Sequence, residues 1–245
     1  MNVSWQSPLE ALITIDTHLT GENSHDALLR SINFMVYELV SQSNGSSDHE
    51  TLDILNRFYF NTKNFKISSH PVLIKNILQN RSGCGIALAL LYMHLAKCLD
   101  LDFQLIHWPL HAILKWECES KSQFVDLEQN GKLLSEEELL QMVNRHKEQV
   151  QTLNLKEAIT QYLTNISLHY RQVEDFITLH KTLCLTLQLE PENTRCLAER
   201  ALLRKELGMV KESICDFKRY FSFTDKNSAS PEIIAAYDSL CVLNP

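Results

Sequence analysis

Strand-like patterns occupy one short part of this 245-residue chain, between residues 102 and 127. The segments DFQLIHWP, HAILKWE and SQFVDL are short, rich in β-branched and aromatic residues, and partly alternating, which favours antiparallel strands. Before them, apolar residues recur at intervals of three and four, most clearly over residues 26–40, and this spacing predicts amphipathic helices. Asn130-Gly131 predicts a turn after these strands, and Ser135 and Glu138 form a capping-box pair that predicts one more helix after the sheet. We therefore expect an α+β domain covering residues 1–150.

The remainder, residues 151–245, has helical patterns and an internal repeat of 34 residues, at 160–193 and 194–227. The positions that a tetratricopeptide repeat fills with small residues, aromatic residues or proline are held in the first copy by Ser167, Tyr170, Phe176 and Pro191. We expect an all-α, tetratricopeptide-like tail, with a plain helical bundle as the alternative. Two repeats are fewer than the roughly three that an independent stack needs, so we expect the tail to pack on the first domain.

The charge and cysteine patterns exclude several classes of function. A formal net charge of −7 without any cluster of Lys and Arg argues against binding to nucleic acid or to an anionic membrane. No leader pattern opens the chain, and the longest apolar run, residues 86–93, is too short to span a bilayer, so we expect a soluble, cytoplasmic protein. The seven cysteines are scattered and lack zinc-ligand spacing, so we expect no disulfide framework, no metal site and no cofactor.

The stretch RSGCGIALALL suggests a nucleophile. It places Cys84 at the predicted start of a helix, where free N–H groups and the helix dipole stabilise a thiolate. His111 and Asp126 lie on neighbouring predicted antiparallel strands, so cross-strand pairing can bring them together, and the three residues would form a nucleophilic triad. The alternatives are a structural Cys84 in a tight glycine turn, a His111 with a local hydrogen bond, and an Asp126 that orients His111 or caps the following turn.

These motifs resemble the transglutaminase-like superfamily. That superfamily carries G-x-C-x-x-x-A-x-L at a helix start, a histidine in the next strand and an aspartate about fifteen residues later, and His111 and Asp126 are fifteen residues apart. Over residues 8–240 the chain is similar to the SirB-type bacterial proteins through RSGCGIALALLYMHLAKCLDLD, WPLHAIL and FVDLEQNGKLLSEEEL. The resemblance implies a papain-like core with a small antiparallel sheet, followed by tetratricopeptide repeats.

The resemblance also locates the catalytic position. Counting back from Leu99, the cysteine of the superfamily corresponds to Gly85, whereas Cys84 comes one residue earlier, which is a rotation of roughly 100° on a helix. The resemblance therefore implies a catalytically degenerate core, and a stack of repeats offers a groove for a partner. Tyr170, Phe176 and Arg200 are the candidate binding residues of that groove.

Three functional hypotheses follow. The first is a non-catalytic adaptor in the cytoplasm that binds a protein or peptide through its repeats. The second is a cysteine-dependent amide or ester hydrolase or acyltransferase, in which Cys84 attacks a carbonyl, His111 transfers the proton and Asp126 orients His111. The third is a ligand-binding module that uses the cleft between helix and sheet, because a fold alone does not determine function.

Overall fold

The computed structural model describes residues 5–43, 45–68, 70, 73–107, 112–118, 121–146 and 151–243. The chain divides into two compact units, Trp5–Tyr162 and the chain from Leu163 onward. Helices dominate both units and one small antiparallel sheet lies in the first, which confirms the predicted α+β class. None of the helices within these ranges is both long and apolar enough to cross a membrane.

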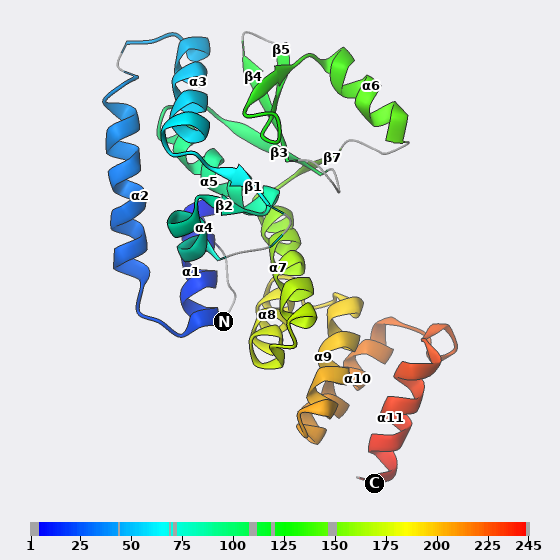
Figure 1. The fold of residues 1–245 in the computed structure, drawn as a ribbon. Helices are drawn as coiled ribbons and strands as arrows, with labels where there is room; N and C mark the ends of the chain where they lie inside the picture. Colours follow the sequence, from blue (N-terminus) through cyan, green and yellow to red (C-terminus); the bar gives the residue numbers. More distant parts are fainter. Residues whose placement is uncertain are drawn as a thin grey trace. The chain divides into compact units, whose positions relative to one another are not determined.

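Six α-helices lie among the described residues of the first unit (Figure 1). They are α1 (Pro8–Thr20), α2 (His25–Val40), α3 (Asp48–Asn56), α4 (Ile74–Asn80), α5 (Gly85–Lys97) and α6 (Glu136–His146). Local sequence explains their starts: Ser7 caps α1 before Pro8, and a capping box of Ser47 and Glu50 begins α3. The predicted box of Ser135 and Glu138 precedes α6, with each backbone N–H donating to the other side chain.

The sheet has the strand order β6-β5-β4-β3-β7, with every neighbouring pair antiparallel. Its strands are β3 (Phe103–His107), β4 (Ile113–Cys118), β5 (Lys121–Asp126), β6 (Lys132–Leu134) and β7 (Gln151–Leu153). The first three match the segments predicted from the sequence. The edge strands β6 and β7 and a separate parallel pair, β1 (Lys66–Ile67) with β2 (Ser82–Gly83), were not predicted, because two- and three-residue strands carry too little pattern to detect.

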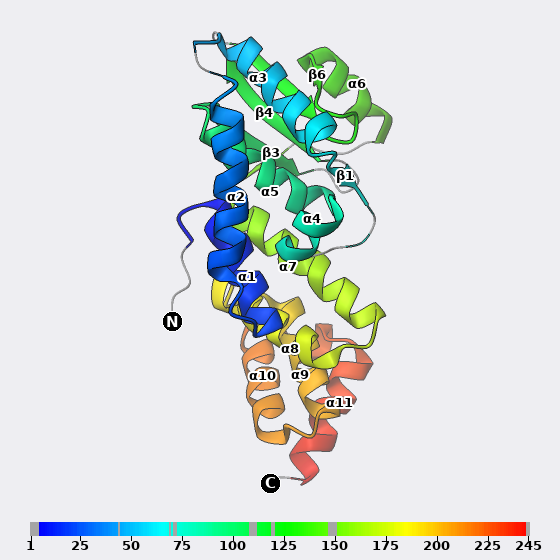
Figure 2. The same cartoon turned by 60° about the vertical axis from the view of Figure 1, so that its left-hand side comes forward.

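Helix α5 is the central element of the first unit. Residues 87–92 are all buried, so the helix has no polar face there, and it contacts α1, α3 and β3 (Figures 1 and 2). The Tyr59 hydroxyl, on a π-helical turn (Arg57–Thr62) that continues α3, donates a 2.8 Å hydrogen bond to the Leu88 carbonyl. The Tyr92 ring packs edge-on against Tyr59 and Phe103, which joins α5 to the sheet through aromatic contacts.

The second unit is helical throughout its described residues. Helix α7 (Leu155–Gln172) spans the boundary between the units and is followed by α8 (Phe176–Leu189), α9 (Thr194–Glu206), α10 (Val210–Phe223) and α11 (Pro231–Leu243), with a short 3-10 turn before α11. Consecutive helices from α8 onward pack on one another, and α11 also contacts α9. The buried Ser213 hydroxyl donates to the Ala201 carbonyl at 2.7 Å, so the small residues at these positions let α9 and α10 approach closely.

Candidate functional site

Cys84 lies where the sequence predicts a helix to begin. It is the N-cap residue of α5, with extended backbone angles of φ −64° and ψ 149°, and its carbonyl accepts the Leu88 N–H at 3.1 Å. The residue is only 7% exposed, and its sulfur is in no disulfide. Cys84 therefore has the helix-terminal position of a cysteine nucleophile but a buried environment.

Gly85, the first residue of α5, lies directly against the sheet. A Cβ atom at this position would be 3.0 Å from the Ala112 Cβ and 3.9 Å from the Ile67 Cδ1. Real Cβ contacts are rarely this short, so a side chain fits here only if Ala112 moves. The position that the sequence comparison predicted for the catalytic cysteine is thus closely packed against the sheet.

The histidine of the candidate triad cannot be placed: His111 lies outside the described residues. Its neighbour Ala112 is buried, and the Ala112 carbonyl accepts the Leu127 N–H at 3.0 Å. One residue further on, Ile113 is paired with Asp126 in the β4–β5 ladder. The sheet therefore places Ala112 beside Gly85 and Ile113 beside the end of β5.

Asp126 is completely buried at the end of β5. Its carboxylate accepts the backbone N–H groups of Glu128 at 2.9 Å and Gln129 at 3.3 Å, and the Gln129 side-chain amide at 2.7 Å. Its carbonyl accepts the Gly131 N–H at 2.9 Å. Within the described ranges, the carboxylate therefore caps the turn that leads from β5 to β6.

An asparagine that the sequence did not indicate holds this turn in place. The Asn56 amide donates to the Gly131 carbonyl at 3.0 Å, and its oxygen accepts the Tyr92 hydroxyl at 2.8 Å. Gly131 has φ +79°, and a Cβ there would be 2.1 Å from the Asn56 oxygen. The Asn-Gly pair predicted the turn, but nothing nearby in the sequence points to Asn56, which is 75 residues away.

In the second unit, Arg200 makes internal contacts. Its guanidinium forms a two-bond pair with the Asp216 carboxylate, at 2.8 and 2.7 Å, and donates to the Cys184 sulfur at 3.4 Å. Arg204 donates to the same carboxylate at 2.7 Å and to His180 Nε2 at 3.1 Å. Burial and the two nearby arginines lower the pKa of His180, so its imidazole is neutral and accepts this hydrogen bond. These contacts tie α8, α9 and α10 together.

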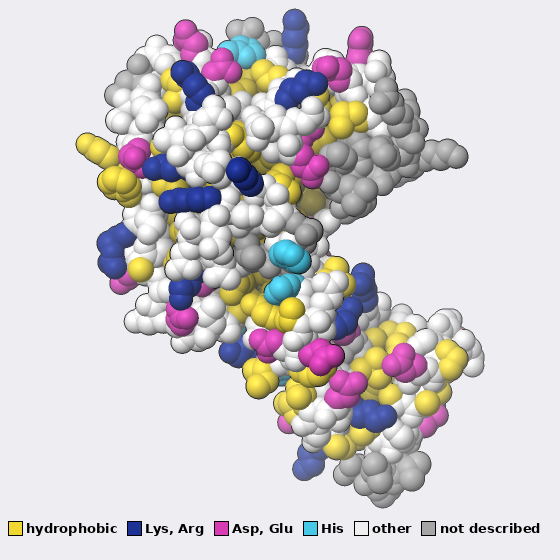
Figure 3. Space-filling view, viewed as in Figure 1, with side chains coloured by type: hydrophobic (Ala, Val, Ile, Leu, Met, Phe, Trp, Pro, Cys, Tyr) yellow, Lys and Arg dark blue, Asp and Glu magenta, His cyan; other side chains and the backbone are white. Residues whose placement is uncertain are grey.

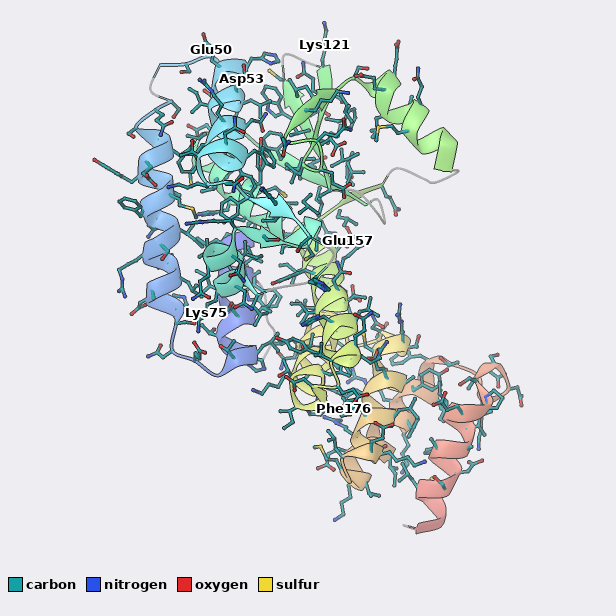
Figure 4. The ribbon with its side chains drawn as sticks, viewed as in Figure 1. Glu50, Asp53, Lys75, Lys121, Glu157 and Phe176 are labelled. Carbon is teal, nitrogen blue, oxygen red and sulfur yellow. The ribbon has the colours of Figure 1, made fainter. Side chains whose placement is uncertain are left out.

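The other two candidate binding residues lie near the turn between α7 and α8. Tyr170 is half-buried and packs against the apolar core of the second unit. Phe176 is the first residue of α8 and is partly exposed (Figure 4). Neither unit, within its described residues, brings together three side chains able to hold a metal ion.

The fold and the comparison of this chain with protein families together define the class of this protein. A helix start, an antiparallel sheet and a buried aspartate at a strand end form the core of an α+β domain of transglutaminase type. The profile of the transglutaminase-like superfamily matches residues 26–174, more than half of the chain, and the chain belongs to this superfamily. The match includes α5, the whole sheet and α7, and therefore every candidate triad residue.

Comparison with curated proteins finds distant relatives. The chain is 24% identical over 212 residues to F-box only protein 21 of Pongo abelii, covering 81% of this chain and 31% of the relative. It is 25% identical over 203 residues to F-box only protein 21 of Homo sapiens, covering 77% of this chain and 30% of the relative. The chain thus spans about a third of the length of these relatives. No solved structure matches the chain significantly.

Proposed function

We propose that this chain is a non-catalytic transglutaminase-like protein that acts as an adaptor in the cytoplasm and binds a protein or peptide through a tetratricopeptide-like tail. In this proposal the chain is of the SirB type, with a core over residues 1–150 and a tail over residues 151–245. The contact of Gly85 with Ala112 carries the proposal.

That contact bears on catalysis because of the position it occupies. The resemblance places the superfamily's nucleophile at Gly85, and a side chain there would be tightly packed against the Ala112 methyl group, at 3.0 Å from its Cβ. Cys84, one residue earlier, is 7% exposed. An acyl-transfer nucleophile must reach a carbonyl carbon, and a buried thiol at the N-cap has little access to one. The hydrogen bonds of Asp126 to Glu128 and Gln129 point to a structural use of this carboxylate.

Surface composition supports binding to another protein. Helix α2 has large aromatic side chains in solvent: Phe34 is 63% exposed and Tyr37 is 74% exposed. Hydrophobic side chains stand out at the edge of the molecule where α2 lies (Figure 3). Phe34 and Tyr37 are three residues apart, so they share one face of α2 and offer a partner a small apolar surface. The curated relatives, F-box only protein 21, are about three times longer than the matched region, so this core also occurs within larger proteins.

The second candidate function is a cysteine-dependent amide or ester hydrolase or acyltransferase that uses Cys84, His111 and Asp126. The observation that favours it is the place of Cys84 at the N-terminus of the 13-residue helix α5, where N–H groups favour a thiolate. In this mechanism the thiolate attacks the carbonyl, His111 moves the proton to the leaving group, and water or a second nucleophile releases the acyl group.

Alkylation kinetics separate the two functions. The rate of iodoacetamide modification is measured for each cysteine between about pH 5 and 9 by mass spectrometry, in wild type and His111→Ala. The adaptor proposal expects Cys84 to react as slowly as the buried Cys118 and far more slowly than the exposed Cys215, with no effect of His111→Ala. Fast reaction of Cys84 well below the ordinary thiol pKa of ~8.5, lost in His111→Ala, would show a thiolate–imidazole pair and favour the enzyme over the adaptor.

The tail is tested by peptide selection on the full-length chain. Peptides selected from a random library are measured against Phe176→Ala, with Phe223→Ala as a control of similar exposure on α10. Loss of binding in Phe176→Ala alone supports recognition at the α7–α8 end of the tail. Equal loss in both variants, or no selectable peptide, contradicts it.

A further inference from the structure

The first unit contains a cleft at the far end of α5 from Cys84. Its volume is about 510 Å³, and its walls come from the last turns of α5, from β3 and β7, and from the starts of α1 and α7. Met93 and Lys97, which line it, lie more than two helical turns along α5 from Gly85. The volume is within the roughly 300–1,000 Å³ range of small-molecule sites. The cleft is therefore large enough for a ligand and lies apart from Cys84 and Gly85.

Apolar side chains form much of this wall. Leu90 and Met93 come from α5, Phe103 and Leu105 from β3, and Leu153 from β7. Leu105 and Leu153 are direct partners in the β3–β7 ladder, so the sheet itself fixes that side of the cleft. A wall of this composition favours a ligand with a substantial apolar body.

The charged side chains that line the cleft already pair with other groups of the protein. Lys97 pairs with Asp102 at 3.2 Å, and both side chains are exposed, which places the pair at the rim. Glu157, in the first turn of α7 (Figure 4), accepts the Asn154 N–H at 2.8 Å and so caps its own helix. The lining thus offers no unmatched cation to an anionic ligand, and an ionic group would lose hydration there without gaining a partner.

His94, on α5, also lines the cleft, and among the described residues it forms no salt bridge with these charged groups. Burial lowers the pKa of His94, so its imidazole is neutral near pH 7 and offers one donor and one acceptor. Its contact with the Cys98 sulfur, at 4.0 Å, is too long to be a strong hydrogen bond. His94 can therefore bind a neutral polar group of a ligand without requiring a charge.

We propose that this cleft binds an uncharged, mainly apolar small molecule, with His94 as its hydrogen-bonding partner. This inference goes beyond the adaptor proposal and needs neither the Cys84 thiol nor the helical tail. It would give the transglutaminase-like core a ligand-dependent role even when the core has no catalytic activity.

Two dyes that share one skeleton test both the site and the charge of its ligand. N-phenyl-1-naphthylamine is neutral, and 1-anilinonaphthalene-8-sulfonate adds a sulfonate to the same rings. Fluorescence titration of the full chain is expected to give saturable one-to-one binding of the neutral dye. The sulfonate is expected to bind at least about tenfold more weakly, because its charge would be desolvated without a partner. Equal or tighter binding of the sulfonate would overturn the uncharged class.

Methionine variants locate the binding. Met93→Trp fills the cleft and is expected to lower the affinity for the neutral dye by about tenfold or more. Met142→Trp, at a half-buried methionine on α6, should leave this affinity unchanged. If Met93→Trp does not fold, Met93→Ala with Met142→Ala makes the same comparison. His94→Leu should lower the affinity for the neutral dye, whose N–H group loses its hydrogen-bond partner. His94→Gln should retain part of that affinity. Absence of saturable binding, or binding that is insensitive to both Met93 variants, refutes the proposal.

Discussion

Replacing Gly131 by alanine tests whether the turn after β5 is held by Asn56. Gly131 has φ +79°, where an alanine is strained by about 1 kcal/mol. The added Cβ would also stand 2.1 Å from the Asn56 oxygen, a distance that no side chain tolerates. Asn56 must therefore leave its place, and its hydrogen bonds to Gly131 and Tyr92 are lost.

The cost of the substitution is worked out from these contacts. Two lost hydrogen bonds at about 1 kcal/mol each, added to the strain, give a destabilisation of about 3 kcal/mol. Gly21→Ala is the matched control, since Gly21 has φ +69° in the same unit but no atom within 4 Å of its Cβ position. Gly21→Ala should be destabilised only by the backbone strain, which is about 1 kcal/mol.

The assay is urea unfolding of the full chain followed by tryptophan fluorescence, since all three tryptophans precede residue 163 and report on the first unit. In an Asn56→Ala background, Gly131→Ala should cost only about 1 kcal/mol more, because the obstacle has gone. The reasoning fails if Gly131→Ala and Gly21→Ala are equally destabilising, or if Asn56→Ala leaves the cost of Gly131→Ala unchanged.

Three further predictions concern other contacts. Asp216→Ala leaves two largely buried arginines unpaired and should destabilise the second unit by about 3–5 kcal/mol, against less than about 1 for the exposed Asp238→Ala, measured by urea unfolding followed by circular dichroism. Burial raises the pKa of Asp16 above 3.8, although the Lys75 N–H lowers it. The folded state therefore binds this proton more tightly than the unfolded chain, so the stability that this group contributes falls as the pH rises from about 3.8 through the folded pKa. The stability of Asp16→Asn relative to wild type should therefore increase as the pH rises above about 4. A stability difference that is constant with pH would contradict this. Gly85→Ala should cost about 1 kcal/mol less in an Ala112→Gly background than in wild type, and the absence of such coupling would argue against the tight contact.

Much of the local structure was predictable from the sequence. The segments that alternate over residues 102–127 form β3, β4 and β5, and the Asn130-Gly131 pair makes the expected turn. The helix start at Cys84 and the capping box before α6 are also confirmed. These features depend on residues a few positions apart, whose backbone preferences and hydrogen bonds act before any tertiary contact forms.

The candidate site was predictable in its order but not in its geometry. Sequence spacing predicted a triad of Cys84, His111 and Asp126, and the family resemblance predicted Gly85 as the catalytic position. It left open whether Asp126 would orient His111 or cap the following turn, since a buried carboxylate can bond to a side chain or to the backbone beside it. The roles of the three residues in chemistry remain predictions.

The sequence by itself determined the main helices and the three longer strands, because periodicity and capping depend on neighbouring residues. The tertiary structure alone decided that Ala112 occupies the space beside Gly85, 27 residues away in the chain, and that Asn56 holds Gly131. It alone formed the cleft beside His94 as well. Such contacts depend on how whole elements pack, and packing is set by the shapes of side chains that are distant in sequence.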